Sequence, residues 1–243
     1  MKNKMILAAM FVLAASVLPA AANMIVTVTA TQGSLTATQQ FLVQCTGGTT
    51  TWSLPSAAAL VTARGVNLGT LTQLDVLTDV DPFVNLHFSV ENDTALPVAY
   101  DISSSVVSFP TIVDPDAYAT AGITLTSDFD GATIAGLFPG GEVYQARYNS
   151  STVYANLVTS LTIADNQTVT TTDRLPTLGT QTIFDSVSSI QSEFDFTLSD
   201  GDQASGTSRF ELTAPVPEPA TMSLLVMGGL ALLVRIKRTT KLN

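Results

Sequence analysis

Apolar and polar residues alternate over short stretches along most of the chain, and turn-forming residues separate these stretches. Residues 23–214 are poor in helical periodicity and rich in Thr, Val, Ser and Gly, which is typical of β-strands. The pattern predicts strands at residues 24–31, 40–45, 84–90, 98–102, 122–126, 142–148, 153–163, 167–172, 181–186, 190–198 and 207–212. Turns at intervals of roughly ten residues favour an all-β fold, an antiparallel β-sandwich of the immunoglobulin-like or jelly-roll type.

The alternation is clearest in residues 83–103. Every second residue from Val84 to Val90 is apolar, and the residues between them, including His87, are polar. The same alternation resumes at Val98 after a turn at residues 91–94. Because side chains point to opposite faces along a strand, we predict a hairpin of two half-buried antiparallel strands.

One stretch of the body departs from this pattern. Residues 56–64 contain three consecutive alanines followed by leucine, and alanine and leucine have high helix propensity. One or two helical turns are predicted there.

Charge is distributed unevenly along the 243 residues. Between Asn23 and Pro217 there is no lysine, and four arginines face nineteen acidic side chains, which gives this body a net charge near −15. Nucleic-acid binding needs clustered Lys or Arg, so the body is predicted to bind no nucleic acid and to be repelled by anionic membranes.

The beginning of the chain has the order of a secretory signal peptide. Lys2 and Lys4 precede the apolar residues 5–18, and the small residues Ala20 and Ala22 follow. This order predicts that residues 1–22 are a signal peptide, cleaved by signal peptidase after Ala22. The protein is therefore expected to be exported.

Single cysteine and histidine residues limit the chemistry of the body. Cys45 has no partner for an intramolecular disulfide and no basic neighbour to lower its pKa, so a buried inert thiol is predicted. His87 has no second histidine with which to share a metal, and a solvated strand residue is favoured over a general base or zinc ligand.

Two turns carry paired carboxylates beside a glycine. Asp128 and Asp130 precede Gly131, and Asp200 and Asp202 flank Gly201. Such turns collect oxygen ligands for Ca²⁺, although Asp-Gly is also ordinary turn chemistry and neither stretch has EF-hand spacing. These aspartates are candidate calcium ligands, and no other cofactor is predicted.

The body contains no Gly-x-Ser-x-Gly motif, so no enzyme activity and no catalytic residue are predicted. A glycan-acting hydrolase would need only two carboxylates and is left as a less favoured alternative. A carbohydrate-binding module is the main alternative, with sugar stacking on exposed aromatic side chains. The candidates for stacking are Trp52, Tyr118, Tyr144 and Tyr148.

The last residues of the sequence have a three-part order. Val216-Pro217-Glu218-Pro219 forms a stiff extended segment, because each proline fixes its own φ and restricts the residue before it. The uncharged residues 220–234 follow and are predicted to be a single transmembrane helix, although fifteen residues are short for a span. Arg235, Lys237 and Arg238 then supply a basic end, as the positive-inside rule expects.

This order resembles the PEP-CTERM sorting domain of exopolysaccharide-producing Gram-negative bacteria over residues 215–243. The resemblance implies that an exosortase recognises Pro217-Glu218-Pro219 and removes or exchanges the tail. It also implies a transient membrane anchor and delivery to the cell envelope or the extracellular space. The resulting hypothesis is a surface or matrix protein with a structural or adhesive role, and with exopolysaccharide or biofilm as its partner.

Overall fold

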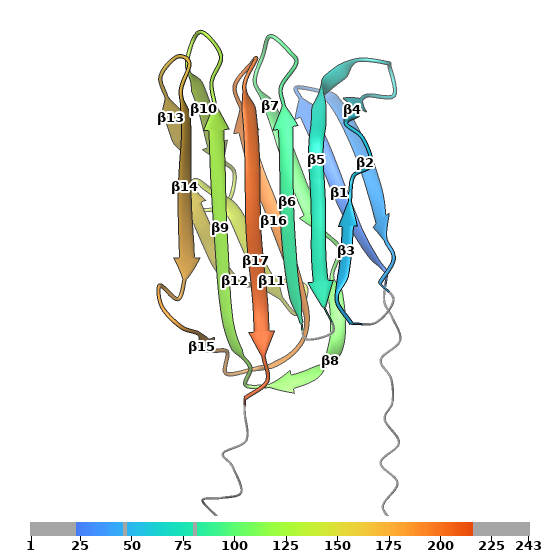
Figure 1. The fold of residues 1–243 in the computed structure, drawn as a ribbon, viewed down its shortest axis with the longest axis vertical. Coiled ribbons are helices and arrows are strands. Elements are labelled where there is room, and N and C mark those ends of the chain that lie inside the picture. Colours follow the sequence, from blue (N-terminus) through green and yellow to red (C-terminus); the bar gives the residue numbers. More distant parts are fainter. Residues whose placement is uncertain (1–22, 46–47, 80–81, 216–243) are drawn as a thin grey trace, which may run out of the picture.

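Two antiparallel sheets make up the fold, and they pack face to face as a β-sandwich (Figure 1). The computed structural model describes residues 23–45, 48–79 and 82–215. The larger sheet, sheet A, consists of β1 (Met24–Gln32), β2 (Leu35–Val43), β7 (Val98–Ser104), β8 (Val107–Val113), β10 (Ala132–Gly136), β11 (Glu142–Tyr148), β12 (Thr152–Thr159), β13 (Leu161–Ile163) and β16 (Ser186–Leu198). The smaller sheet, sheet B, consists of β3 (Thr50–Ser53), β4 (Ala58–Val61), β5 (Asn67–Asp79), β6 (Phe83–Glu91), β9 (Asp116–Thr126), β14 (Thr168–Leu175), β15 (Gln181–Thr182) and β17 (Gln203–Thr213). The predicted antiparallel sandwich is confirmed.

Strand β16 lies at the centre of sheet A, whose main order is β12-β11-β16-β7-β1-β2. Residues 186–190 of this strand pair with β8 and residues 193–198 with β7. Its residues 190–194 pair with β11, and residues 196–198 pair with β10. Sheet B has the main order β14-β9-β17-β6-β5-β3, with β15 beside β9 and β4 beside β5. Within the described residues, no helix is long and apolar enough to cross a membrane.

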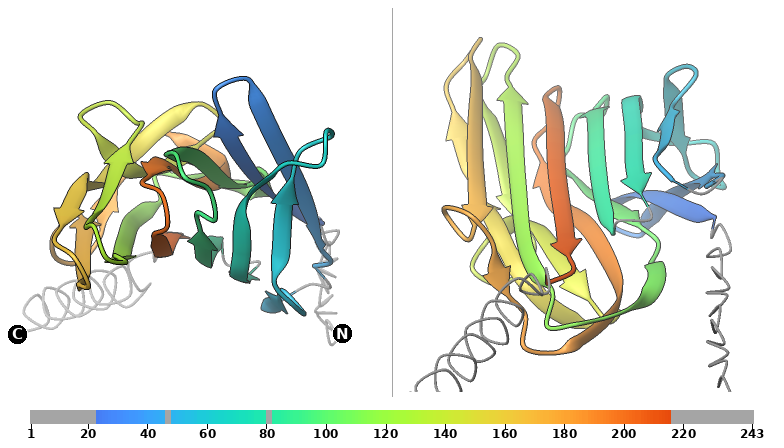
Figure 2. Two further views of the ribbon diagram at one scale, coloured as in Figure 1. Left: turned by 90° about the horizontal axis from the view of Figure 1, so that it is seen from above. Right: turned by 60° about the horizontal axis from the view of Figure 1, so that its bottom comes forward.

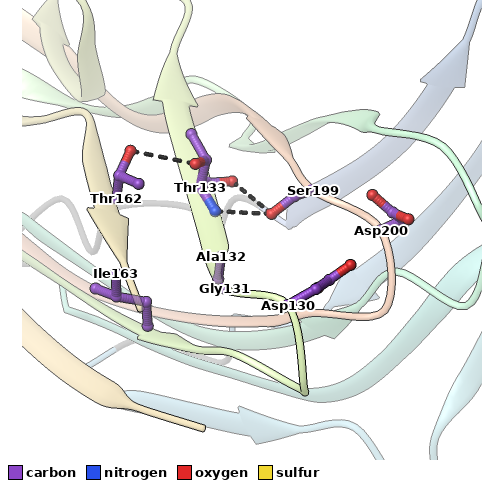
Figure 3. Close-up of a pocket in the computed structure, with 8 residues that line it drawn as sticks. All are labelled: Asp130, Gly131, Ala132, Thr133, Thr162, Ile163, Ser199 and Asp200. Carbon is purple, nitrogen blue, oxygen red and sulfur yellow. Dashed lines mark hydrogen bonds between the residues drawn. The ribbon is translucent and has the colours of Figure 1, made fainter. Parts of the chain in front are cut away.

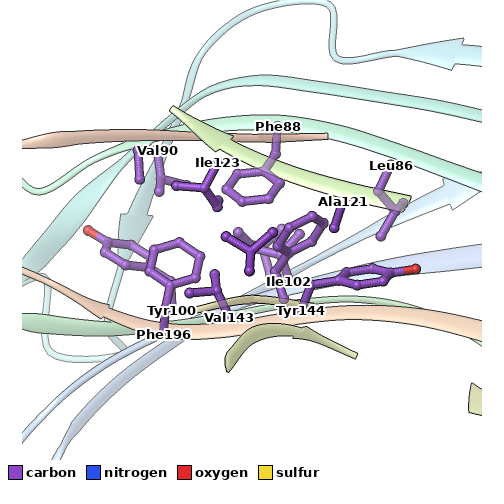
Figure 4. Close-up of a cluster of buried hydrophobic side chains, with 14 of the residues drawn as sticks. Leu86, Phe88, Val90, Tyr100, Ile102, Ala121, Ile123, Val143, Tyr144 and Phe196 are labelled. Carbon is purple, nitrogen blue, oxygen red and sulfur yellow. The ribbon is translucent and has the colours of Figure 1, made fainter. Parts of the chain in front are cut away.

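Large aromatic side chains from both sheets fill the space between them (Figure 4). Phe88 of sheet B meets Phe194 of sheet A edge to face, with ring centroids 4.9 Å apart. The Tyr144 ring of the neighbouring strand β11 has its centroid 4.9 Å from that of Phe194, and its hydroxyl shares a hydrogen bond of 3.0 Å with Ser192. These rings are fully buried, so the core depends on hydrophobic packing between the alternating faces that the sequence shows.

Consecutive strands often belong to different sheets, and this corrects the predicted hairpin. Strands β6 and β7 both form, but β6 pairs with β5 and β17 whereas β7 pairs with β1 and β16. The connection of six residues between them passes over the end of the sandwich from sheet B to sheet A instead of turning back within one sheet. Strands β16 and β17 are joined by a similar crossing connection.

Buried Asn92 ties these two crossing connections together. Its amide nitrogen Nδ2 donates to the carbonyl oxygens of Leu96, Leu198 and Ser199 at 3.0, 3.2 and 2.9 Å. Its backbone N–H donates to the carbonyl of Asp202 at 2.9 Å. A single buried side chain therefore bonds backbone oxygens of both connections.

The predicted helical turn at residues 56–64 is wrong. Residues 58–61 form strand β4, which pairs with β5 and places Leu60 in the core. Pairing and burial outweigh the helix propensity of the alanines, which amounts to less than about 1 kcal/mol per residue. Strands β3, β5, β8 and β10 were not predicted, and the predicted strand at residues 153–163 is divided into β12 and β13.

The first described strand begins, and the last described strand ends, at the same end of the sandwich (Figures 1 and 2). Strand β1 begins there at Met24, and β17 ends there at Thr213. We refer to this as the exit end. The loop of residues 127–131 and the loop of residues 199–202 lie at the opposite end, which we call the acidic end.

Candidate functional site

The structure brings the four predicted calcium candidates together at the acidic end. Asp128 and Asp130 lie in the loop between β9 and β10, and Asp200 and Asp202 lie in the loop between β16 and β17. The two loops touch, because a Cβ atom added at Gly201 would come within 2.5 Å of Asp128 Oδ2. Gly201 also has a φ of 72°, a conformation that favours glycine.

Asp202 is the structural centre of this cluster and is only 1% exposed. One carboxylate oxygen accepts the backbone N–H of Asp128 at 3.2 Å, and the other accepts the hydroxyl of Ser199. Burial raises the pKa of this carboxyl, and the hydrogen bonds from Ser199 and Asp128 oppose that rise. Asp202 therefore joins the two loops as a hydrogen-bond acceptor.

Asp130 is fully exposed, and its electrostatics come from its neighbours. A side-chain hydrogen bond with Asp128 and the charge of Asp128 raise the pKa of Asp130, and the charges of Asp200 and Asp202 add to this. The backbone N–H of Asp130 also donates to Asp128 Oδ1 at 3.2 Å. Mutual repulsion of this kind is what a bound cation would relieve.

A shallow pocket of about 260 Å³ lies beside these loops (Figure 3). Asp130 and Asp200 approach it from one side, and the hydroxyls of Thr133, Thr162 and Ser199 line another part. The backbone N–H of Thr133 donates to Ser199 Oγ at 2.7 Å, so strand β10 holds that hydroxyl in place.

Within the described residues, no three or more His, Cys, Asp or Glu side chains are arranged to hold a metal ion. The four aspartates share one end of the fold, but the carboxylate oxygens of Asp202 already accept hydrogen bonds from the loops. Calcium binding at the acidic end stays a prediction.

The four aromatic candidates for sugar stacking have different surroundings. Tyr144 is fully buried in the core and cannot stack on a ligand. Trp52 packs on Phe41 with centroids 5.7 Å apart, and the Tyr118 ring lies under the guanidinium carbon of Arg174 at 4.9 Å.

Tyr148 is the candidate that lines a pocket. The pocket measures about 300 Å³ and lies at the exit end, where the β12 edge of sheet A faces the β14 edge of sheet B. Its lining has no charged side chain and consists of Tyr148, Val153, Tyr154, Leu175, Gln181, Thr182, Ile183 and Phe184.

His87 lies on the outer face of sheet B, as a solvated strand residue would. Its Nδ1 atom is 3.1 Å from Asp75 Oδ2 and 3.2 Å from Gln73 Nε2, and its side chain is 41% exposed. Burial works to raise the pKa of Asp75, but hydrogen bonds from Ser53, Gln73 and His87 outweigh it and lower that pKa. Cys45 is partly buried against the core and donates a weak hydrogen bond to the carbonyl of Val43 at 3.8 Å.

A second group of carboxylates, which the sequence analysis did not identify, lies on sheet A. Asp101 of β7 and Asp195 of β16 are paired across adjacent strands, and Glu193 lies two residues before Asp195. Arg147 forms an ion pair with Glu193 at 2.7 Å. Alternation placed these residues on a polar face, but it could not show that β7 and β16 are neighbours.

Burial is the main cause of the raised pKa values of Asp101, Glu193 and Asp195. The positive charge of Arg147 opposes the rise in all three, and the charge of Asp101 adds to it in Glu193 and Asp195. One carboxylate oxygen of Asp101 is buried and has no hydrogen-bond partner among the described residues.

The sorting residues Val216, Pro217, Glu218 and Pro219, the predicted span at residues 220–234 and the basic residues 235–238 lie outside the described part of the chain. So does the predicted signal peptide, residues 1–22. The last strand, β17, ends at Thr213, three residues before the Val-Pro-Glu-Pro segment.

Comparisons with known proteins bear mainly on this last segment. No curated protein matches the chain. A solved structure of the infectious bursal disease virus Gx strain covers 85% of this chain and 71% of its own, at 8% identity and a TM-score of 0.20. A structure of the Gt strain of that virus covers 88% and 73%, at 11% identity and a TM-score of 0.15. These TM-scores are too low to support an argument.

Residues 215–238 match the family model described as the PEP-CTERM protein-sorting motif. The match covers the proline signature, the apolar run and the basic residues that the sequence analysis identified. The chain therefore carries a PEP-CTERM sorting domain, which indicates an exported protein that has a membrane-anchored sorting signal and is processed by an exosortase.

Proposed function

We propose that the β-sandwich is the part of the protein that acts outside the cell, as a structural or adhesive component of an exopolysaccharide matrix or biofilm. The observation that carries this proposal is the sorting motif at residues 215–238, which begins two residues after the last strand of the sandwich. Removal of the tail after this point would leave every strand of both sheets intact.

The composition of the sandwich supports a role without catalysis. Its acidic surface with no lysine suits a soluble polyanion in a hydrated matrix. Its core of interlocking aromatic rings gives a rigid body that needs no disulfide. We assign it no enzymatic activity.

The experiment replaces Pro217-Glu218-Pro219 with three alanines in a host that contains the exosortase. We expect the altered protein to remain unprocessed in the membrane fraction while the unaltered protein reaches the envelope or the medium. A second arm removes the gene and measures matrix mass and cohesion. Unchanged processing would contradict the sorting step, and an unchanged matrix would contradict the structural role.

A carbohydrate-binding module is the second candidate, because Tyr148 lines an uncharged pocket that also holds Gln181 and Thr182. An aromatic ring beside amide and hydroxyl groups is suited to a neutral sugar. Retention of the processed protein on polysaccharide isolated from its own host, and loss of retention in Tyr148→Ala, would support this function. No retention would remove it.

A further inference from the structure

The exit end of the sandwich carries large apolar side chains that nothing in the described structure covers. Phe184, in the connection between β15 and β16, is 89% exposed, the highest value among the large apolar residues that the structure describes. Leu178, in the connection between β14 and β15, is 84% exposed, and Val113 at the end of β8 is 60% exposed. Both connections and the end of β8 lie at the exit end in Figure 1.

Phe184 lies close to the point at which the chain leaves the fold. Thr213, the last residue of β17, pairs with Asp116, and Asp116 pairs on its other side with Thr182. Neighbouring strands are about 4.8 Å apart, which places Thr182 roughly 10 Å from Thr213. The backbone N–H of Ile183 donates to the carbonyl of Pro115 at 2.8 Å and fixes the segment just before Phe184.

The chain between this point and the apolar run is short. Only residues 216–219 separate Pro215 from Ala220, where the uncharged run begins. An extended chain spans at most about 3.6 Å per residue, so Pro215 lies no more than about 18 Å from the start of that run. The thirteen residues of β5 extend for roughly 43 Å, so the acidic end lies much farther from the membrane.

We propose that Phe184, together with Leu178 and Val113, enters the headgroup region of the membrane that holds the sorting signal. The inference rests on the proposed function, because it requires residues 220–234 to be inserted before processing. Phe and Leu side chains bury at the boundary between headgroups and acyl chains, and the short connection keeps this ring within reach of that depth. The unprocessed protein therefore stands on the membrane with its acidic end outward.

The negative charge of the body makes the contact between Phe184 and the membrane depend on the covalent link to the inserted tail. Asp114, Asp116 and Asp185 lie near Phe184 at the exit end, and the whole body is strongly acidic. Anionic lipid repels such a body, and an isolated contact of three side chains is weak. The link holds the apolar residues at the surface at a high effective concentration. Once the tail is removed, the contact is lost and the body leaves the membrane.

The test uses the full chain in vesicles of phosphatidylethanolamine and phosphatidylglycerol. Cys45→Ser provides a background without cysteine, and Phe184→Cys introduces one site for a polarity-sensitive fluorophore. Phe129→Cys is the matched control, because Phe129 is 83% exposed but lies in the loop between β9 and β10 at the acidic end. Vesicle flotation reports separately whether the tail is inserted.

We expect the fluorophore at residue 184 to shift to shorter wavelength and to be quenched by spin-labelled lipid, with no change at residue 129. Cleavage at a protease site placed between residues 215 and 220 should return the signal at residue 184 to its aqueous value and release the body. If the protein floats with the vesicles but the fluorophore has its aqueous wavelength at both residue 184 and residue 129, the membrane contact of Phe184 is wrong. The membrane anchor in the proposed function would still stand. Failure to float would contradict the membrane anchor in the proposed function, and the inference would fail with it. The wavelength shift at residue 184 could instead increase with the density of protein on the vesicles and show no quenching by spin-labelled lipid. That result would mean that a second copy of the protein covers Phe184, and it would overturn the lipid contact.

Discussion

The backbone N–H of Asn92 donates to the carbonyl oxygen of Asp202 at 2.9 Å, and the N–H of Gly201 returns a hydrogen bond to the carbonyl of Asn92 at 3.0 Å. This reciprocal pair joins the connection between β6 and β7 to the connection between β16 and β17. Both connections cross from one sheet to the other, so the pair fixes how the two sheets meet at the acidic end.

Replacing Asn92 with alanine should destabilise the protein by about 2–3 kcal/mol, because it removes the buried amide group that donates to the carbonyl oxygens of Leu198 and Ser199. Urea denaturation followed by circular dichroism would measure the change. Asn67→Ala, at an exposed residue, serves as the control and should cost much less. Equal losses in the two variants would contradict the role assigned to Asn92.

Gly206 of β17 lies opposite Phe88 of β6, and the Phe88 ring occupies the space above it. A Cβ atom at Gly206 would come within 2.2 Å of Phe88 Cε1. Gly206→Ala should therefore force the buried ring to move and destabilise the fold by about 1–3 kcal/mol. Gly122→Ala is a matched change in the neighbouring strand, where the nearest atom would be 3.1 Å away. Its smaller cost in the same denaturation experiment is the expected result.

The loop role of Asp202 predicts a contrast with Asp200. Asp202→Ala removes the acceptor for Asp128 N–H and for the Ser199 hydroxyl, so its melting temperature should fall. Asp200→Ala removes one negative charge from a crowded loop, and its melting temperature should stay the same or rise. A larger loss for Asp200→Ala would show that the loops are held together differently.

Calcium at the acidic end is tested by titration. A bound cation should raise the melting temperature, and at one hundred times its dissociation constant the gain in folding free energy would be about 2.7 kcal/mol. The effect should disappear in Asp130→Asn and should not be reproduced by sodium chloride of equal ionic strength. A flat titration would remove calcium from this site.

Stability should increase as the pH falls from neutral toward 4. The pKa values of Asp101, Glu193 and Asp195 are raised in the folded protein, mainly by burial. The stability that their protonated forms contribute is fully present at a pH below the pKa values of the unfolded state, 3.8 for aspartate and 4.5 for glutamate. It is lost as the pH rises through the higher pKa values of the folded state. Melting curves at pH 5 and pH 7 would show this, and Asp101→Asn should reduce the difference between them.

Alternation along the chain was sufficient to predict several strands, and residues 142–148 were predicted with the bounds that β11 has. It could not assign strands to sheets, because β6 and β7 have the same pattern whether they pair as a hairpin or lie in opposite sheets. Strand β4 shows a different limit, since its alanines favour a helix until β5 provides a pairing partner.

The acidic site was predictable only in part. Turn chemistry placed Asp128, Asp130, Asp200 and Asp202 in loops, and the loops are there. Their meeting depends on β9 pairing with β17 and β10 with β16, which are contacts between residues far apart in the sequence. The paired carboxylates of Asp101 and Asp195 depend on topology in the same way.

In the proposed orientation, with the exit end at the membrane, every anchored molecule would have the same polarity. Molecules anchored side by side would stand parallel and present a layer of negative tips to the outside. Like charges at these tips repel over about 8 Å at physiological ionic strength and over longer distances in fresh water. The spacing of the anchored layer would then follow the salinity of the surroundings, with denser packing at high salt.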